Sequence, residues 1–265
     1  MNKIFLLQLL ITFLTGSLWI YFTVIAGLRF GSKIGGFIGG LPSTALLSFF
    51  FIGYTQSPEM ASAATAVFPV ALSISGLFLA VYASLVRRGF IPALIAGLCF
   101  WFLLSAGIFF LRLENFLSVL LIYAAITLAA YIILEKYLKI RSVSQERRGN
   151  PEKYLIVRSL FGGAIVMLTV LVAKTVGPFT GGIFAAFPAM FISTLTISYK
   201  VNGIEFSRAL TKPLMVTGMI TITVYAIAIR YLYLSTGIYL GTVLGILISS
   251  FSAYITFRLI LPRLI

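Results

Sequence analysis

Three charged residues lie at or near the edges of long apolar stretches, where their chemistry could move protons or hold anions. Glu59 and Glu205 each open an apolar stretch, and Lys212 lies about two turns into the second one. Carboxylates within a membrane are functional by default, and lysines near its surface attract anionic groups. We predict that Glu59, Glu205 and Lys212 are gates or coupling sites. Two alternatives stay open: acidic residues that stabilise a helix N-terminus and a lysine that extends to the membrane surface.

Prolines and hydroxyl residues interrupt two further apolar stretches, "GSKIGGFIGGLPSTALLS" and "GPFTGGIFAAFPAMFIST". Proline removes a backbone donor and clashes with the preceding turn, so it marks a place where a helix bends or opens. Hydroxyls can line a polar path, although they also bond to carbonyls of their own helix. The predicted polar path comprises Pro42, Ser43, Thr44, Ser48, Pro188, Ser193 and Thr194.

Glycines precede both prolines at four-residue spacing, which is typical of helices that approach each other closely in membranes. An alternative, compatible with the first, is a discontinuous helix whose freed backbone groups line a cavity. The predicted packing residues are Gly31, Gly35, Gly36, Gly39, Gly40, Gly177, Gly181 and Gly182.

The residue types that enzymes and metal sites use are scarce. The chain has no histidine and no aspartate, and its one cysteine is Cys99. Acid–base, nucleophilic and metal-dependent sites need such groups. "GGFIGG" opens an apolar stretch rather than a strand–turn–helix unit, so it is not a dinucleotide fingerprint. We therefore expect no catalytic residues, no metal, no cofactor and no enzyme activity.

Composition indicates a helical membrane protein. The 265 residues are 60% hydrophobic and 10% charged, with a mean hydropathy of +1.09. Runs of about 20 apolar residues cross a bilayer as helices, and their continuity argues against the alternating pattern of a β-barrel. We predict an all-α membrane protein with nine transmembrane helices at residues 4–28, 34–53, 59–86, 90–111, 115–135, 154–174, 179–199, 206–231 and 236–261.

The distribution of basic residues predicts the orientation. Cytoplasmic loops collect lysine and arginine. With the N-terminus outside and the C-terminus in the cytoplasm, 16 of the 20 basic residues face inward. The net charge of +14 is then explained by topology rather than by nucleic-acid binding. We expect an integral protein of the cytoplasmic membrane.

An internal repeat relates the two halves. Leu9–Ala80 aligns without gaps to Leu155–Ala226, and 15 of the 72 positions are identical, against roughly six by chance. Pro42 matches Pro188 and Glu59 matches Glu205. The copies start five helices apart, an odd number, so they are inverted. The predicted organisation is a four-helix repeat (4–111), a linking helix (115–135), a cytoplasmic connector (136–153) and an inverted four-helix repeat (154–265).

The segment "GPFTGGIFAAFPAMFIST", with its weaker copy in the first half, resembles the core motif of the GlpM-like small bacterial membrane proteins. The resemblance covers roughly the first two helices of each half. It implies an architecture in which a single-repeat protein pairs head-to-tail and this chain is the fused, two-repeat form. It implies no functional residue. The first copy departs from the motif, with Gly-Gly-Leu where the second has Ala-Ala-Phe.

Inverted repeats are frequent in secondary transporters. We therefore expect a transporter that moves a small solute, of which an anion is one option, by alternating access where the two repeats meet. The alternatives are a passive channel of the same symmetry and a lipid-binding or assembly protein without transport activity. The expected partners are the lipid bilayer and an unidentified solute or ion, with no nucleic acid; a homodimer is left open.

Overall fold

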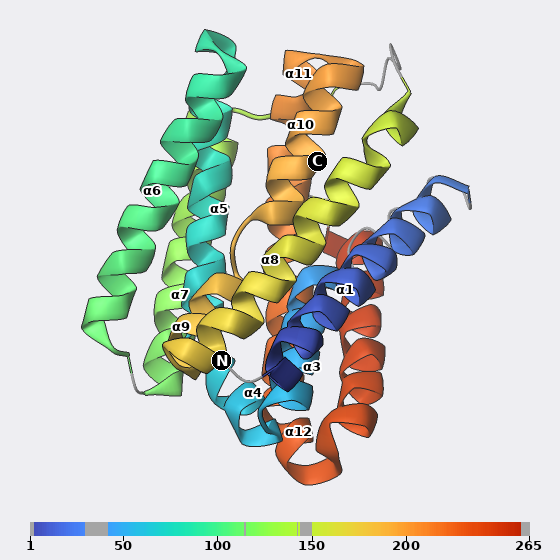
Figure 1. Cartoon of the computed structure of the whole chain (residues 1–265). Coiled ribbons are helices and arrows are strands. Elements are labelled where there is room, and N and C mark those ends of the chain that lie inside the picture. Colours follow the sequence, from blue (N-terminus) through green and yellow to red (C-terminus); the bar gives the residue numbers. More distant parts are fainter. Residues whose placement is uncertain (1–2, 30–41, 114, 142, 144–149, 261–265) are drawn as a thin grey trace.

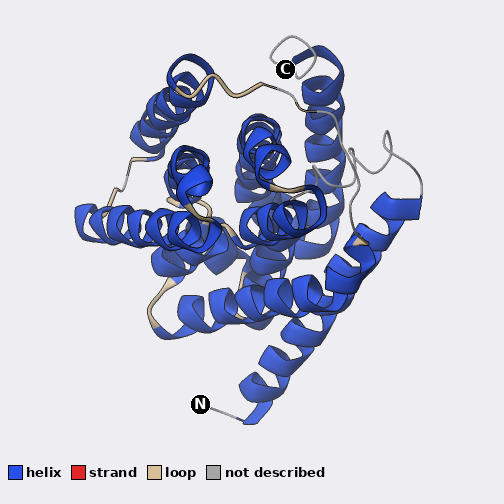
Figure 2. Cartoon of the chain, turned by 90° about the horizontal axis from the view of Figure 1, so that it is seen from above, coloured by secondary structure: helices blue, strands red, loops and turns tan. Residues whose placement is uncertain are grey.

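The computed structural model describes residues 3–29, 42–113, 115–141, 143 and 150–260. Every regular element in these ranges is a helix (Figure 2). The first part of the chain forms α1 (Lys3–Arg29), α3 (Ser43–Thr55), α4 (Pro58–Ala64), α5 (Phe68–Leu85), η1 (Val86–Arg88), α6 (Phe90–Leu111), α7 (Phe116–Ile132) and η2 (Ile133–Tyr137). The second part forms η3 (Pro151–Tyr154), α8 (Leu155–Thr175), α9 (Pro178–Ala185), α10 (Ala189–Asn202), α11 (Ile204–Ala209), α12 (Thr211–Ile255) and η4 (Thr256–Ile260).

The chain is a polytopic membrane protein. Seven stretches of the described chain are long and apolar enough to cross a membrane, and Ser43–Thr55 is a shorter apolar helix. The outer helices α6 and α7 expose large apolar side chains such as Leu103, Phe110 and Leu121. Such side chains are favourable against lipid, because no water is present to penalise their exposure.

Helix α5 lies at the centre of the bundle. It packs against α6, α7, α9 and α12 (Figure 1), and nearly all of its residues are buried. Phe68, Phe78 and Tyr82 are among the largest fully buried side chains. The bundle has two ends: α4 lies at one and α11 at the other (Figure 1). These are called the α4 end and the α11 end below.

Two stretches that are predicted as single helices, 59–86 and 179–199, are interrupted. Residues 59–86 form α4 and α5, which are separated at Thr65–Val67 because Pro69 has no N–H to bond the Thr65 carbonyl. Residues 179–199 are divided between α9 and α10. Only the part of the predicted helix 34–53 from Pro42 onward lies in the described residues.

The predicted helix 206–231 is interrupted at Leu210, between α11 and α12. Its longer part and the predicted helix 236–261 are joined at a sharp turn within α12. Gly237 has φ 78° and ψ 172°, a conformation that essentially only glycine adopts without strain. The chain reverses there (Figure 1), so α12 is a helical hairpin that contributes two antiparallel arms, Thr211–Thr236 and Ile238–Ile255. The predicted boundary between these helices, residues 232–235, lies just before the turn.

Candidate functional site

The interruption between α9 and α10 is the central irregular feature of the bundle. α9 ends at Ala185, and α10 begins at Ala189, with Pro188 as its N-cap residue. The N–H groups of Ala186 and Phe187 donate to the carbonyls three residues earlier, those of Ile183 at 3.1 Å and Phe184 at 3.0 Å. This is the spacing of a 3-10 turn rather than of an α-helix. The connection lies between the two ends of the bundle (Figure 1). It is therefore irregular backbone inside an apolar protein, which needs its own hydrogen-bond partners.

Ser75 of α5 supplies such a partner. Its hydroxyl donates to the Ala186 carbonyl at 2.7 Å and accepts from Trp101 Nε1 of α6 at 3.0 Å. Ser75 and Ala186 are buried, and Trp101 is 1% exposed. Buried polar groups are costly unless they are paired, so this chain of bonds holds the interruption in place. Sequence reasoning missed Ser75 and Trp101; the only signal was two polar groups inside apolar helices.

Helix α3 begins in the same way as α10. Pro42 has φ −76° and ψ 50°, and Pro188 has φ −76° and ψ 37°. Each proline carbonyl accepts the first bond of the helix that follows, from Leu46 at 2.7 Å and from Ile192 at 2.8 Å. The two predicted prolines thus have matching backbone roles.

Two of the predicted path residues line one cavity. Thr44 and Pro188, with Phe187 and Phe191, surround a hollow of about 30 Å³. A single water needs roughly 10–15 Å³ of such space, so the cavity has room for water but not for a larger solute.

The other predicted hydroxyls are distributed along the two helices. Ser43 and Thr194 are half-buried. Ser48 is buried, and its hydroxyl has no hydrogen-bond partner within the described chain. Ser193 donates to the Met190 carbonyl of its own helix at 3.1 Å, which is the back-bonding alternative.

Two of the predicted second-half glycines pack closely against other helices. A Cβ on Gly181 would lie 2.5 Å from Ala173 Cβ of α8, and one on Gly182 would lie 2.0 Å from the Ala64 carbonyl of α4. Gly177 begins α9 with φ 118°. The predicted Gly31, Gly35, Gly36, Gly39 and Gly40 lie outside the described residues.

Helices α1 and α8 also cross closely, at Gly16 and Gly163. A Cβ on Gly163 would lie 2.1 Å from Ser17 Oγ and 2.7 Å from the Phe13 carbonyl, and one on Gly16 would lie 3.3 Å from Gly163 Cα. The repeat alignment included the Gly16–Gly162 match but did not identify it as a packing contact. Small residues at such crossings let two helix backbones approach.

The predicted charged residues lie at opposite ends of the bundle. Glu59 is exposed in the first turn of α4, where Ser57 caps the helix. It lies before the candidate membrane segment of α5, and its bond to the Ser57 side chain lowers its pKa, so it is ionised at neutral pH. Glu205, at the α11 end, accepts two hydrogen bonds from Arg87, of 2.8 and 2.7 Å. Both carboxylates therefore lie in the first turn of a helix, as the alternative of a residue that stabilises a helix N-terminus expects.

Lys212 is buried rather than extended to the surface. Its side chain is 6% exposed, and its ammonium forms an ion pair with Glu135 of η2, which is 42% exposed. Sequence reasoning did not select Glu135, because the linking helix had no repeat partner with which to compare it. Glu135 is nonetheless one of only six acidic residues in the chain.

At each end of the bundle, an arginine donates hydrogen bonds to backbone carbonyls of other helices or of the segments that follow them. At the α11 end, Arg208 donates to the carbonyls of Ala83, at 2.9 Å, and Leu138, at 3.1 Å. At the α4 end, Arg230 donates to the Ser62 carbonyl at 3.1 Å, and Ser62 Oγ donates back to the Arg230 carbonyl at 2.7 Å. The Arg230 guanidinium also lies 4.5 Å from the centre of the Phe116 ring. Both contacts join the two halves of the chain.

The described residues contain no cluster of three or more His, Cys, Asp or Glu side chains that could hold a metal ion. The polar groups described above are hydrogen-bond donors, acceptors and fixed charges. They can orient a polar or anionic solute, fasten helices together and bind water.

Comparison with known proteins gives one match. Residues 155–261 match a family described as "Protein of unknown function (DUF3147)". This segment runs from the start of α8 to beyond the described part of the chain. No curated protein and no solved structure matches the chain. None of these comparisons links the chain to the GlpM-like proteins, and that resemblance stays a prediction.

Proposed function

We propose that the protein is a secondary transporter that moves a small, polar or anionic solute by alternating access between two inverted repeats. The observation that carries this proposal is the α9–α10 interruption. The Ala186 carbonyl in it accepts a hydrogen bond from Ser75, and Pro188 and Thr44 of α3 line the same small cavity. Interrupted helices at the meeting point of two repeats are the usual binding site of transporters with inverted halves.

The element boundaries support the repeat. Adding 146 to the first residue of α3, Ser43, gives Ala189, which is the first residue of α10. Adding 146 to Pro58, the first residue of α4, gives Ile204, which is the first residue of α11. Helices α4 and α11 lie at opposite ends of the bundle (Figure 1), as an inversion requires. The family match at residues 155–261 also agrees with the proposed second repeat, 154–265.

The two arginine contacts support an exchange of roles. Ser62 plus 146 is Arg208, and Arg230 minus 146 is Ser84, which follows Ala83. The contact of Arg230 with Ser62 and that of Arg208 with Ala83 therefore join positions that correspond to within one residue, with the two halves exchanged. In the proposed cycle each arginine contact closes one end of the path. When one contact is broken and the other is intact, the solute reaches the path from the end whose contact is broken. Glu59, Glu205 and Lys212 remain proposed gates or coupling sites near these contacts.

The proposal is tested without knowledge of the solute by chemical labelling from either side of a membrane. Thr44→Cys is introduced into a chain whose single cysteine is removed by Cys99→Ser, and a membrane-impermeant maleimide is added to one side of oriented vesicles. We expect slow labelling in this background. Arg208→Gln accelerates labelling from the α11 end, and Arg230→Gln accelerates it from the α4 end. Arg88→Gln, an exposed arginine at the α11 end, is the control and changes nothing.

The alternatives predict different labelling. A passive channel labels from both sides in the same variant, because its path is open throughout. A lipid-binding or assembly protein without a path labels from neither side in any variant. Acceleration from the same side by both arginine variants contradicts the exchange of roles. In reconstituted vesicles, a transporter gives saturable solute flux that Glu205→Gln alters, whereas linear flux favours a channel.

A further inference from the structure

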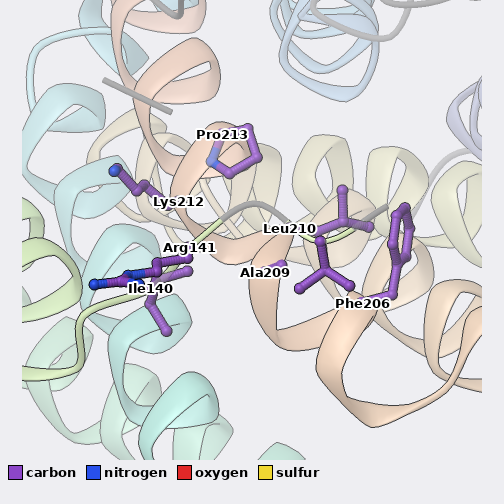
Figure 3. Close-up of a pocket in the computed structure, with 8 residues that line it drawn as sticks. Ile140, Arg141, Phe206, Ala209, Leu210, Lys212 and Pro213 are labelled. Carbon is purple, nitrogen blue, oxygen red and sulfur yellow. The ribbon is translucent and has the colours of Figure 1, made fainter. Parts of the chain in front are cut away.

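A second cavity lies at the α11 end, away from the α9–α10 interruption. It has a volume of about 120 Å³ and is formed where the chain that follows η2 meets the junction of α11 and α12 (Figure 3). Its main lining residues are Ile140, Arg141, Phe206, Leu210, Lys212 and Pro213. None of the predicted path residues lines it, so it is separate from the path proposed above.

The wall of this cavity is divided into a basic side and an apolar side. Lys212 and Arg141 extend in the same direction, away from Phe206 and Leu210, which lie on the opposite side (Figure 3). Ile140 is buried, and Pro213 and Leu210 are half-buried. A ligand that fits both sides carries an anionic group next to hydrocarbon.

The charges near the cavity favour an anion. Lys212 is 6% exposed and pairs with Glu135, but an ammonium has three donors, so two remain for a further acceptor. Arg141 is exposed. Arg208 nearby bonds to two backbone carbonyls, which do not neutralise it. The charged residues on the elements around the cavity are Glu135, Lys136, Lys139, Arg141, Glu205, Arg208 and Lys212, five cations and two carboxylates. Glu205 is already paired with Arg87.

The location favours a lipid over a soluble anion. The apolar stretches Phe116–Tyr137 and Ile204–Leu259 each have a terminus beside this cavity. The ends of membrane helices lie at the depth of the phospholipid headgroups, where basic residues bind anionic lipids. The cavity is too small for a whole phospholipid, so it accommodates a phosphate and its nearest carbons.

We propose that this cavity binds the phosphate group of an anionic phospholipid, with Lys212 and Arg141 as donors and Phe206, Leu210 and Pro213 against the adjoining carbons. The site does not rest on transport. It lies on the linking segment after α7 and on the start of α12. A bound lipid therefore joins these two elements, in addition to the ion pair of Glu135 with Lys212.

Thermal unfolding of the purified full chain in detergent tests the proposal. Phosphatidylglycerol, phosphatidylcholine and inorganic phosphate are added separately. We expect phosphatidylglycerol to raise the Tm by about 4 °C or more at saturation, with little change from the other two. Arg141→Gln and Lys212→Gln remove at least half of this rise. The control Arg88→Gln retains it, since Arg88 is an exposed arginine at the same end that does not line the cavity.

Three outcomes overturn the proposal. An equal rise with phosphatidylcholine shows that the effect does not depend on the anionic headgroup. An equal rise with inorganic phosphate assigns the cavity to a soluble anion. A full rise in Arg141→Gln shows that the lipid binds elsewhere. Arg141 is exposed, so this variant tests the binding site even if Lys212→Gln, which changes a buried residue, fails to fold. None of these outcomes affects the labelling experiment on Thr44→Cys.

Discussion

The hydroxyl of Ser75 donates a 2.7 Å hydrogen bond to the carbonyl of Ala186, 111 residues further along the chain. This bond joins the central helix of the bundle, α5, to the point where α9 ends. Because Ser75 also accepts from Trp101, three helices depend on one buried hydroxyl. The interruption of the α9–α10 segment is therefore a supported structure rather than a local defect.

Ser75→Ala is expected to destabilise the protein by about 1–3 kcal/mol, because it leaves the Ala186 carbonyl and the Trp101 N–H buried without partners. Ser73→Ala is the matched control: it is equally buried, in the same helix, and donates only to Val70 of that helix at 2.6 Å. Thermal unfolding in detergent compares the two variants. Equal effects would show that the Ser75 bond has no special role.

Trp101→Phe is expected to cost less than Ser75→Ala, since it removes one donor but keeps most of the aromatic surface. The two residues touch, so their effects should not add. A double-mutant cycle measures the difference between the double variant and the sum of the single variants, and contacting residues give 0.5–3 kcal/mol. Strict additivity would contradict the Trp101–Ser75–Ala186 chain.

Gly163→Ala is expected to destabilise the α1–α8 crossing by about 1–3 kcal/mol, because the new Cβ would lie 2.1 Å from Ser17 Oγ and 2.7 Å from the Phe13 carbonyl. Gly107→Ala in α6 is the control, since nothing lies within 4 Å of its Cβ position. There alanine should be neutral or stabilising by up to about 1 kcal/mol. A neutral Gly163→Ala would mean that the two helices are further apart.

Gly237→Ala is expected to cost about 1–3 kcal/mol although nothing lies within 4 Å of the new Cβ. The cost arises from the backbone, because φ 78° with ψ 172° is strained for any residue with a side chain. The Gly107→Ala variant again isolates the backbone effect, since that glycine is helical. Equal melting temperatures of the two variants would indicate that α12 does not turn at Gly237.

Glu135→Gln is expected to destabilise the protein more than Glu205→Gln. Removal of the Glu135 charge leaves the buried Lys212 ammonium without its counter-ion, which is costly in a low-dielectric environment. Glu205 and Arg87 are 53% and 59% exposed, and ion pairs exposed to solvent contribute little to stability. Melting curves at low and high salt measure both effects, and only that of Glu205→Gln should fade with salt. The opposite ranking would contradict the burial of Lys212.

Local sequence patterns predicted the class of protein and many of its helices. Uninterrupted apolar runs such as 90–111 and 154–174 agree closely with α6 and α8, because a backbone in lipid must satisfy its own hydrogen bonds and a helix does so within one segment. Pro188 and the glycines before it marked the irregular segment, since their effects on the backbone are local.

The repeat alignment related positions but not contacts. It paired Pro42 with Pro188, whose backbone conformations match. It could not indicate that Thr44 and Pro188 would line one cavity or that Gly182 would lie against Ala64. Such contacts depend on how whole helices cross, which is decided by side chains from several elements at once. Spacing along one helix does not record them.

The amino-acid sequence by itself determined that this chain forms apolar helices, where prolines end them and where charges are concentrated, because these follow from the chemistry of each segment. Only the tertiary structure decided which groups are paired. Ser75 bonds to Ala186, Lys212 is buried against Glu135, and Arg230 fastens α12 to α4. Each of these contacts joins residues at least 77 positions apart, and a partner at such a distance is selected by packing rather than by local preference.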